Sequence, residues 1–241
     1  MKPYSKQITI KYSDLDSAGF LSLRALMGYL QDVAGSHSSS VGYGYDNIPE
    51  THVTWLLLDW KVDMLTQPEY NSVLTIYTWP RVLEKFYSYR EFEVYDSNQN
   101  LVAVASSKWI LYNVETKKVA RITEDIVNRF GTYEKCVFEK PMNERPKEPQ
   151  DSALKFKYTI QRRDIDTNQH VNNLNYIDIA IEALPEDVFQ DNEFTKVEIH
   201  YKKEMHYKDK IRCYYGYRNN KHVVTIKNED DSVVHAIVKL Y

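Results

Sequence analysis

The segment QRRDIDTNQHVNNLNYIDIAIE, residues 161–182, decides the fold because an earlier stretch of the chain repeats its pattern. The segment KYSDLDSAGFLSLRALMGYLQD, residues 11–32, aligns with it without a gap at a constant offset of 150 positions. Both segments begin with two closely spaced aspartates and continue into an apolar run with helical spacing. Self-similarity of this kind indicates one supersecondary unit used twice.

Two later matches extend the repeat. DWKVDM at residues 59–64 matches HYKKEM at residues 200–205 with an offset of 141. LVAVASSKW, starting at Leu101, resembles SVVHAIVKL, starting at Ser232, with an offset of 131. A falling offset predicts shorter loops in the second copy.

A change of composition separates the two copies. The stretch KPMNERPKEPQDS, residues 140–152, is rich in proline and charge, which is typical of a linker. We therefore predict an N-terminal domain over residues 1–139, a linker over 140–152 and a C-terminal domain over 153–241.

Each copy predicts a strand, one helix and then several strands. Ser22 can cap the first helix; Asn172 or Asn173 can cap the second, which Pro185 should end. The apolar faces of these helices comprise Leu23, Leu26, Leu30 and Val33, then Leu174, Ile177, Ile181 and Leu184. Strand-like runs cover 53–64, 72–80, 87–96 and 101–114, then 196–205, 210–218, 222–228 and 232–241. Antiparallel sheet wrapped on one helix per copy is an α+β architecture.

Composition limits the functional class. The chain has 241 residues, a net charge of -3 and 43% hydrophobic residues, which indicate a folded protein with no overall attraction to nucleic acid. Its two cysteines lie in different halves and predict no disulfide framework. The N-terminus has no apolar signal region and the chain has no run long enough to span a membrane, so we expect a cytoplasmic protein.

The motif RRDIDTNQHVNNLNYIDIAIEALP, followed about twenty residues later by EIHYKKEM, resembles the plant and bacterial acyl-acyl-carrier-protein thioesterases, which release fatty acids. That family has Asp, Asn and His at alternate positions before HVNN-type residues, and a Tyr-(Lys/Arg)-(Lys/Arg)-Glu segment downstream. The resemblance covers nearly the whole chain. It implies a tandem hotdog fold, in which a helix is wrapped by a curved antiparallel sheet twice over, with the acyl-chain pocket and a degenerate site in the N-terminal copy.

The two copies differ where chemistry needs polar side chains. Asn168 and His170 correspond to Ala18 and Phe20, which cannot exchange protons or hydrogen-bond through their side chains. This asymmetry indicates that the second copy catalyses and the first shapes a pocket. Asp166, by contrast, has an aspartate at the matching position of copy one, so it can equally serve only to fix the turn before the helix.

The candidate catalytic residues are Asp166, Asn168, His170 and Glu204. Histidine exchanges protons near neutral pH, and on an extended segment alternate side chains point to the same side. The resemblance implies that Glu204 is a general base or nucleophile acting with His170, while Asn168 and Asp166 position them. The residue after this glutamate, a cysteine in many plant members, is Met205 here, so a thiol is dispensable if the mechanism is shared.

Plainer interpretations remain for the same residues. Asn168 and His170 can be loop or helix-cap residues, and Glu204, which aligns with Asp63, can be a solvated carboxylate on a strand face. His200 and His206 suggest a metal site with His170, but the sequence has no compact ligand pattern, so we expect neither a metal nor a cofactor.

The resemblance implies hydrolysis of a fatty acyl thioester on the phosphopantetheine of acyl carrier protein, releasing free fatty acid. Basic pairs, Arg162 with Arg163 and Lys202 with Lys203, are usually solvated, and we expect them to receive the acidic carrier protein. An acyl-CoA thioesterase, a hotdog hydratase or dehydratase, and a non-catalytic acyl-binding module are the alternatives. Acyl length and saturation stay open, as does the oligomeric state, for which a homodimer is one option.

Overall fold

The computed structural model describes residues 2–139, 146–191 and 193–241, and the chain forms two compact units, residues 1–142 and 143–241. The first part of the predicted linker, residues 140–145, lies outside the described residues. Within the described ranges, the helices are each too short or too polar to cross a membrane. The two units are described separately below.

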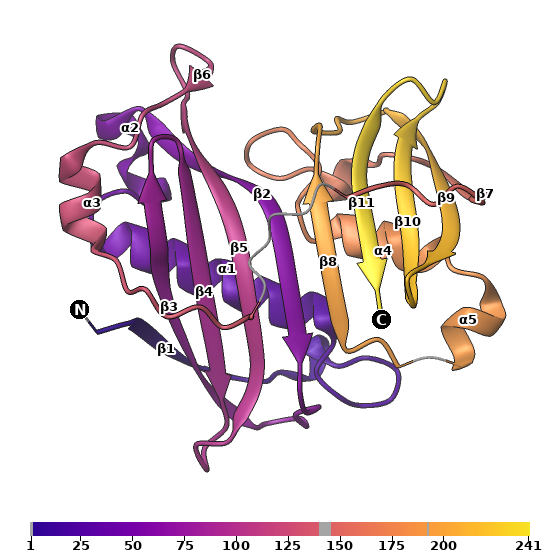
Figure 1. Cartoon of the computed structure of the whole chain (residues 1–241), viewed down its shortest axis with the longest axis horizontal. Helices are drawn as coiled ribbons and strands as arrows, with labels where there is room; N and C mark the ends of the chain where they lie inside the picture. Colours follow the sequence, from indigo (N-terminus) through magenta and orange to yellow (C-terminus); the bar gives the residue numbers. More distant parts are fainter. Residues whose placement is uncertain (1, 140–145, 192) are drawn as a thin grey trace. The chain divides into compact units, whose positions relative to one another are not determined.

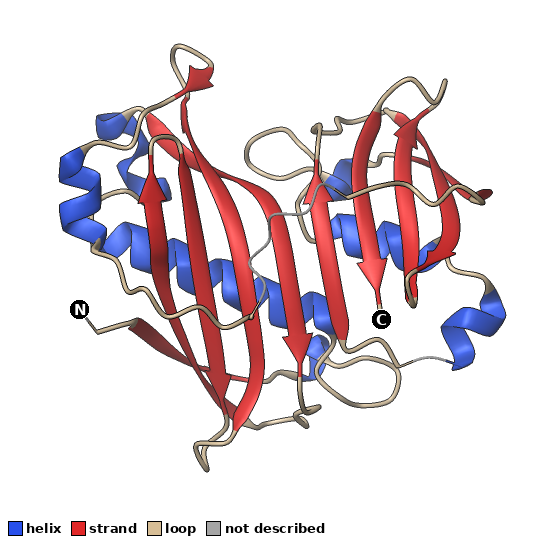
Figure 2. Ribbon diagram, viewed as in Figure 1, coloured by secondary structure: helices blue, strands red, loops and turns tan. Residues whose placement is uncertain are grey.

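Unit 1 is an antiparallel sheet with one long helix, α1, lying across it (Figures 1 and 2). The strand order is β1-β3-β4-β5-β2, with β6 paired to β5. The strands are β1 (Tyr4–Thr9), β2 (Val53–Met64), β3 (Val73–Glu84), β4 (Tyr87–Tyr95), β5 (Leu101–Asn113) and β6 (Lys118–Val119). The helices are the short η1 (Tyr12–Asp14), η2 (Tyr45–Asn47) and α2 (Ile48–Thr51), together with α1 (Leu23–Ser40) and α3 (Glu124–Phe130).

Helix α1 forms as its sequence predicts. The Ser22 hydroxyl accepts a hydrogen bond from the amide of Ala25 at 3.1 Å, which satisfies one of the free donors of the first turn. The apolar face is buried against the sheet, since Leu26, Leu30 and Val33 are fully inaccessible to solvent. This helix therefore supplies much of the core of unit 1.

Unit 2 repeats the arrangement with shorter elements (Figure 1). Its antiparallel strand order is β8-β11-β10-β9-β7, and α4 packs against β10 and β11. The strands are β7 (Ala153–Thr159), β8 (Lys196–Tyr201), β9 (Lys210–Arg218), β10 (Lys221–Asn228) and β11 (Val234–Leu240). The helices are η3 (Arg162–Asp164), α4 (Asn175–Glu182) and α5 (Glu186–Asp191). Together the two units confirm the α+β, tandem hotdog architecture.

The start of α4 differs from the prediction. Its N-cap is Leu174, whose side chain cannot cap, so the predicted cap at Asn172 or Asn173 is wrong. The side chain of Asn172 instead closes a turn just before the helix, where its Oδ1 accepts a hydrogen bond from the amide of Leu174 at 2.9 Å. The helix then runs for only 8 residues, against 18 for α1.

A largely buried carboxylate joins three strands of the unit 2 sheet. Glu198 on β8 accepts from Lys221 at 2.6 Å and Lys239 at 2.8 Å, and from the hydroxyl of Tyr241 at 3.1 Å. Burial alone raises the pKa of Glu198, but the hydrogen bonds from the two lysines outweigh it and lower this pKa to about 2. Glu198 is therefore ionised and paired throughout the neutral range.

Strand β8 ends four residues earlier than the sequence pattern predicts, at Tyr201 rather than Met205. The amides of Lys202 and Lys203 both donate to the carbonyl of His235, at 2.8 and 3.2 Å. Two successive donors on one acceptor end the regular ladder and turn the chain out of the sheet. Glu204 therefore lies on a loop after β8 and not on a strand face.

Candidate active site

The polar loop before α4 is a tight turn built around Asp166. The amide of Asp166 donates to the carbonyl of His170 at 2.8 Å, and the amide of Gln169 donates back to the carbonyl of Asp166 at 3.1 Å. The carboxylate oxygen Oδ1 of Asp166 accepts from the amides of Asn168 at 2.8 Å and His170 at 3.4 Å. Asp166 thus sets the backbone path on which Asn168 and His170 lie.

The matching loop of unit 1 has the same hydrogen bonds. Asp16 pairs with the carbonyl of Phe20 at 2.8 Å, and its Oδ1 accepts from the amides of Ala18 at 3.0 Å and Phe20 at 3.1 Å. A left-handed residue completes each turn: Gly19 with φ 88° in unit 1 and Gln169 with φ 64° in unit 2. The two aspartates therefore fix the turn in both copies, and any further role of Asp166 in catalysis stays a prediction.

A second segment, residues 202–206, is fixed to this loop by the backbone. The amide of Val171 donates to the carbonyl of Met205 at 2.8 Å. In unit 1 the equivalent bond runs from Leu21 to the carbonyl of Pro68 at 2.9 Å. Met205 therefore corresponds to Pro68, an offset of 137 positions instead of the 141 that the sequence match indicated.

Neighbouring backbone bonds give the same offset. The amide of Lys208 donates to the carbonyl of Ile160 at 3.1 Å, and that of Asn71 donates to the carbonyl of Ile10 at 3.1 Å. Both donors have positive φ, 74° and 65°. The strand ends agree: the amides of Leu65 and Thr66 both donate to one carbonyl directly after β2, as those of Lys202 and Lys203 do after β8, and the matching donors are 137 positions apart.

This register corrects the predicted equivalence of Glu204 with Asp63. At an offset of 137, Glu204 corresponds to Gln67, and Asp63 corresponds to His200. The carboxylate of Glu204 is therefore specific to unit 2, just as Asn168 and His170 are. The residues of unit 1 that correspond to Asn168, His170 and Glu204 cannot accept a proton at neutral pH.

The fold brings two of the predicted residues together with one that was not predicted. One ligand-type atom from each of His170, Glu204 and His206 lies within 4.8 Å of the others. The rings of His170 and His206 meet edge to face, with centroids 4.9 Å apart. Asn168 lies on the exposed tip of the same loop, two residues before His170.

Alternation along the extended segment explains why Glu204 and His206 face the loop. Met205 between them is fully buried, while Glu204 and His206 are exposed. Side chains two residues apart share a side of an extended chain, and this parity was the available sequence signal for His206. We predicted no metal site because the sequence shows no compact pattern, yet folding places three side chains of metal-binding type side by side.

A buried phenol lies beneath the site. Tyr176 on α4 is 3% exposed, and its ring meets that of Tyr201 edge to face at 5.0 Å. Burial raises the pKa of Tyr176; a hydrogen bond with the backbone of Met205 opposes this, and the charge of Glu204 adds to it. The phenol therefore stays protonated, and it links α4 to the segment that carries Glu204.

Exposed basic side chains lie on the two segments that carry the site, residues 161–170 and 202–208. The four residues of the predicted docking pairs are exposed, and the guanidinium of Arg162 lies over the ring of Tyr207, 5.7 Å from its centroid. The ammonium of Lys208 lies over the same ring at 5.3 Å. A negatively charged substrate or carrier would meet a positive surface here.

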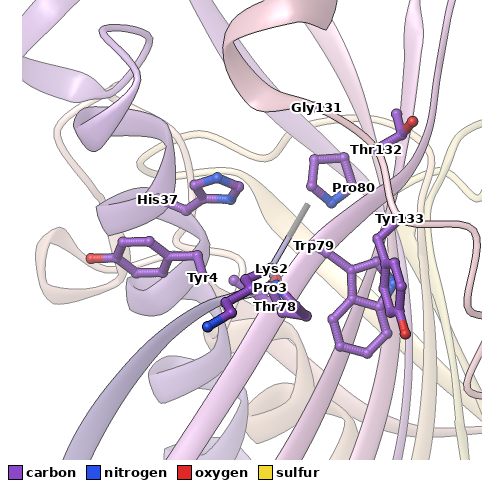
Figure 3. A pocket seen from close by; sticks show the side chains of 10 residues that line it. All are labelled: Lys2, Pro3, Tyr4, His37, Thr78, Trp79, Pro80, Gly131, Thr132 and Tyr133. Carbon is purple, nitrogen blue, oxygen red and sulfur yellow. The ribbon is translucent and has the colours of Figure 1, made fainter.

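A small hollow in unit 1 contains a different histidine (Figure 3). His37 stacks on Tyr4 with centroids 5.1 Å apart and accepts a hydrogen bond from Arg90 at 3.0 Å. Burial, together with the charge of Arg90, lowers the pKa of His37 to about 3, so this histidine is neutral. The hollow has a volume of about 10 Å³, roughly the space of one water molecule, and cannot hold an acyl chain.

The cysteines lie outside the cluster. Cys213 is buried in β9, where burial raises the pKa of its thiol to about 12. Cys136 is exposed in unit 1, and its sulfur contacts the carbonyl of Phe138 at 3.1 Å. A protonated, buried thiol suits packing and not nucleophilic attack.

Comparison with protein families accounts for most of the chain. The model of the acyl-ACP thioesterase N-terminal domain matches residues 1–130, and that of the acyl-ACP thioesterase C-terminal domain matches residues 147–239. The oleoyl-acyl carrier protein thioesterase of Coriandrum sativum is 22% identical over 227 residues, covering 86% of this chain and 61% of the relative. Oleoyl-acyl carrier protein thioesterase 1 of Arabidopsis thaliana is 23% identical and is covered over 62% of its length. Both relatives are described as chloroplastic, and the chain spans about three-fifths of their length.

Solved structures show the same fold. An acyl-ACP thioesterase from Bacteroides thetaiotaomicron superposes with a TM-score of 0.86 at 24% identity, covering 98% of this chain and 96% of that one. The 12:0-ACP thioesterase from Umbellularia californica superposes with a TM-score of 0.84 at 17% identity, covering 98% of this chain and 95% of that one. The similarity therefore extends over both units.

Proposed function

The chain belongs to the acyl-ACP thioesterase family, and from that premise we propose that it hydrolyses the thioester of a fatty acyl group on acyl carrier protein. The products are a free fatty acid and the carrier with its phosphopantetheine thiol. The observation that carries the proposal is the proximity of His170 and Glu204, within 4.8 Å, on the loops of unit 2. At the equivalent positions unit 1 has Phe20 and Gln67, so one site per chain is proposed.

The roles follow from the chemistry of each side chain. In the general-base route, the carboxylate of Glu204 takes a proton from water as the water oxygen attacks the thioester carbon. The C–S bond then breaks, and the sulfur leaves as a thiol after gaining a proton from His170, which lies within 4.8 Å of Glu204. In the alternative route, the carboxylate of Glu204 attacks the carbon itself, the C–S bond breaks, and the sulfur leaves as a thiol with a proton from His170. Water then cleaves the resulting anhydride, which releases the fatty acid and restores the Glu204 carboxylate.

The remaining predicted residues position these groups. Asn168 follows the turn set by Asp166 and lies on its exposed tip, where its amide can hydrogen-bond the thioester or the attacking water. Asp166 acts through the loop backbone, because its carboxylate already accepts two amide hydrogen bonds. A hydrolytic mechanism of this kind has no need of a thiol, which agrees with a methionine directly after Glu204.

The partner in this proposal is an acidic acyl carrier protein docking on the exposed basic residues of unit 2. Replacing Arg162, Arg163, Lys202 and Lys203 with serine should lower kcat/KM for acyl-ACP more than for a small soluble thioester. Equal losses on both substrates would argue against docking. The cytoplasmic location and a homodimer stay predictions; light scattering on the purified chain measures the second.

The experiment that tests the function is a substrate panel. Acyl-ACPs from C8 to C18, saturated and unsaturated, are incubated with the purified chain, and free fatty acid and carrier thiol are quantified separately. The proposal expects the two products in equal amounts, with acyl-CoA substrates turned over more slowly. Hydration of enoyl substrates would support a hydratase instead, and tight acyl binding without product would support a non-catalytic module.

A further inference from the structure

We propose that His170, Glu204 and His206 form a binding site for Zn²⁺ or a similar transition-metal ion, and that the bound ion switches hydrolysis off. The regulatory half of this inference rests on the proposed function, because the ion would occupy two of the groups assigned to hydrolysis. The binding half rests on geometry alone. His206 has no role in the hydrolysis proposed above, and in this site it is a metal ligand.

The donor set suits the ion. Two imidazole nitrogens and one carboxylate oxygen are ligands that Zn²⁺ takes in proteins, at about 2.0–2.2 Å from the metal. Tetrahedral ligands at that distance lie roughly 3.4 Å apart, and here the three atoms already lie within 4.8 Å of one another. Small side-chain rotations close the difference, and Glu204 and His206 are exposed and free of core packing.

The backbone holds the ligands in place before the ion arrives. His170 lies on the turn fixed by Asp166, and the Val171 to Met205 hydrogen bond at 2.8 Å fixes that turn to the segment with Glu204 and His206. Met205 is fully buried and anchors this segment between the two exposed ligands. A site assembled from two anchored loops loses little conformational freedom on binding.

A second carboxylate, that of Asp209, lies near the ring of His206. Oδ2 of Asp209 accepts the backbone amide of His206 at 2.8 Å and lies 3.7 Å from Nδ1 of its ring. A metal-binding histidine that donates one ring N–H to a carboxylate has its tautomer fixed and its other nitrogen directed to the ion. A small rotation of the ring would shorten the 3.7 Å contact to hydrogen-bond length. With Nδ1 facing Asp209, Nε2 is the nitrogen available to a metal.

Charge and symmetry define what the site would bind and how many ions. Arg162 and Lys208 nearby disfavour a hard cation held by charge alone, whereas imidazole ligands select Zn²⁺, Cu²⁺ or Ni²⁺ through bonding. Unit 1 has Phe20, Gln67 and Glu69 at the equivalent positions, which leaves a single strong ligand. The expected stoichiometry is therefore one ion per chain.

Inhibition follows because the ion would occupy the catalytic atoms of Glu204 and His170. A metal bound to Glu204 takes the carboxylate lone pair that would accept the proton of water, and one bound to His170 takes a ring nitrogen. With three protein ligands, a fourth position stays open to water. At a free Zn²⁺ concentration ten times the dissociation constant, hydrolysis should fall roughly tenfold, and a chelator should restore it.

The test uses the full chain freed of metal by a chelator and dialysis. Isothermal titration with ZnCl₂ measures stoichiometry and affinity, and the visible absorption of Co²⁺ reports on nitrogen and oxygen coordination. His206→Ala is the test variant, expected to weaken Zn²⁺ binding at least tenfold and to raise by the same factor the Zn²⁺ concentration that halves its own metal-free rate of hydrolysis. His52→Asn is the matched control, since the side chain of His52 is 45% exposed, against 52% for His206, and lies 3.0 Å from the carboxylate of Glu115.

The outcomes separate the two proposals. Binding of one Zn²⁺ that is weakened by His206→Ala but not by His52→Asn supports the site, even in a protein that shows no hydrolysis. Absence of binding to the wild-type chain, or equal affinity in both variants, overturns the site. Zn²⁺ that binds these residues and leaves hydrolysis unchanged, or accelerates it, overturns the regulatory half.

Discussion

The duplicated turn offers a test with its own internal control. Asp166→Ala removes the acceptor of two amide hydrogen bonds, those of Asn168 at 2.8 Å and His170 at 3.4 Å. Asp16→Ala removes the same two bonds in unit 1, at 3.0 and 3.1 Å. The two substitutions therefore cause matched structural damage in the two copies.

The magnitude follows from those contacts. Hydrogen bonds to a charged group contribute about 1.5–3 kcal/mol each when well shielded, and these loops are exposed, so each substitution should cost about 1–3 kcal/mol in unfolding free energy. Activity should differ between the two variants, with the larger loss in Asp166→Ala. A displacement of about 1 Å at a reacting group costs on the order of 100-fold in rate, and only the Asp166 turn carries His170.

The assay compares urea unfolding and kcat/KM on acyl-ACP for both variants at a temperature where both are folded. Asp166→Asn keeps an acceptor oxygen and should restore most stability and activity if Asp166 acts through the backbone. A loss of activity in Asp16→Ala as large as that in Asp166→Ala would refute the assignment of chemistry to unit 2. Full activity in Asp166→Ala would refute the positioning role of the turn.

Three further outcomes are expected. The folded state lowers the pKa of Glu198 to about 2, so its ionised carboxylate stabilises the protein at pH values above the unfolded pKa. This contribution, at most about 3 kcal/mol, is lost as the pH falls toward 2. Glu198→Gln should therefore flatten the acid side of a plot of urea midpoint against pH, and an unchanged plot would count against the ion pairs. Gln169→Gly should leave activity intact and stabilise the chain by up to about 1 kcal/mol, because the φ angle of Gln169 is 64° and a glycine, Gly19, occupies the matching position in unit 1. Thermal unfolding measures this, and a lower melting temperature would contradict it. Replacing Cys136 and Cys213 with alanine should leave kcat within about threefold, since neither thiol lies in the cluster; a loss of 100-fold or more would point to a thiol mechanism.

Much of the fold can be predicted from local pattern. Strands β2 and β9 begin and end where the sequence runs indicate, and Ser22 caps α1 as expected. These features depend on alternation, helical spacing and side chains that reach their own backbone. Such signals are local, so one sequence suffices.

The correspondence between the two copies could not be predicted in the same way. The sequence match placed Glu204 opposite Asp63, while backbone hydrogen bonds place it opposite Gln67, four residues away. Strand patterns have a period of two, so a shift by an even number of residues keeps every side chain on its expected face. The register is fixed by contacts between segments distant in sequence, the hydrogen bonds from Val171 to Met205 and from Lys208 to Ile160.

The surroundings of Glu204 in the structure differ from those predicted from the sequence. The sequence pattern predicted a strand over residues 196–205 that included Glu204, but β8 ends at Tyr201, and the exposed neighbour of Glu204 is His206. Where a strand ends depends on which carbonyl its amides reach. Here that carbonyl belongs to His235, far along the chain, so the sequence near Glu204 does not reveal it.

The central claim is that a carboxylate present only in unit 2 activates the water that opens the thioester. The most direct measurement is kcat on acyl-ACP for Glu204→Ala beside Gln67→Ala, its counterpart in unit 1. We expect Glu204→Ala to lose roughly 10²- to 10⁴-fold, the usual worth of a general base, and Gln67→Ala to stay near the wild-type rate. Undiminished turnover by Glu204→Ala in a folded protein would contradict the account.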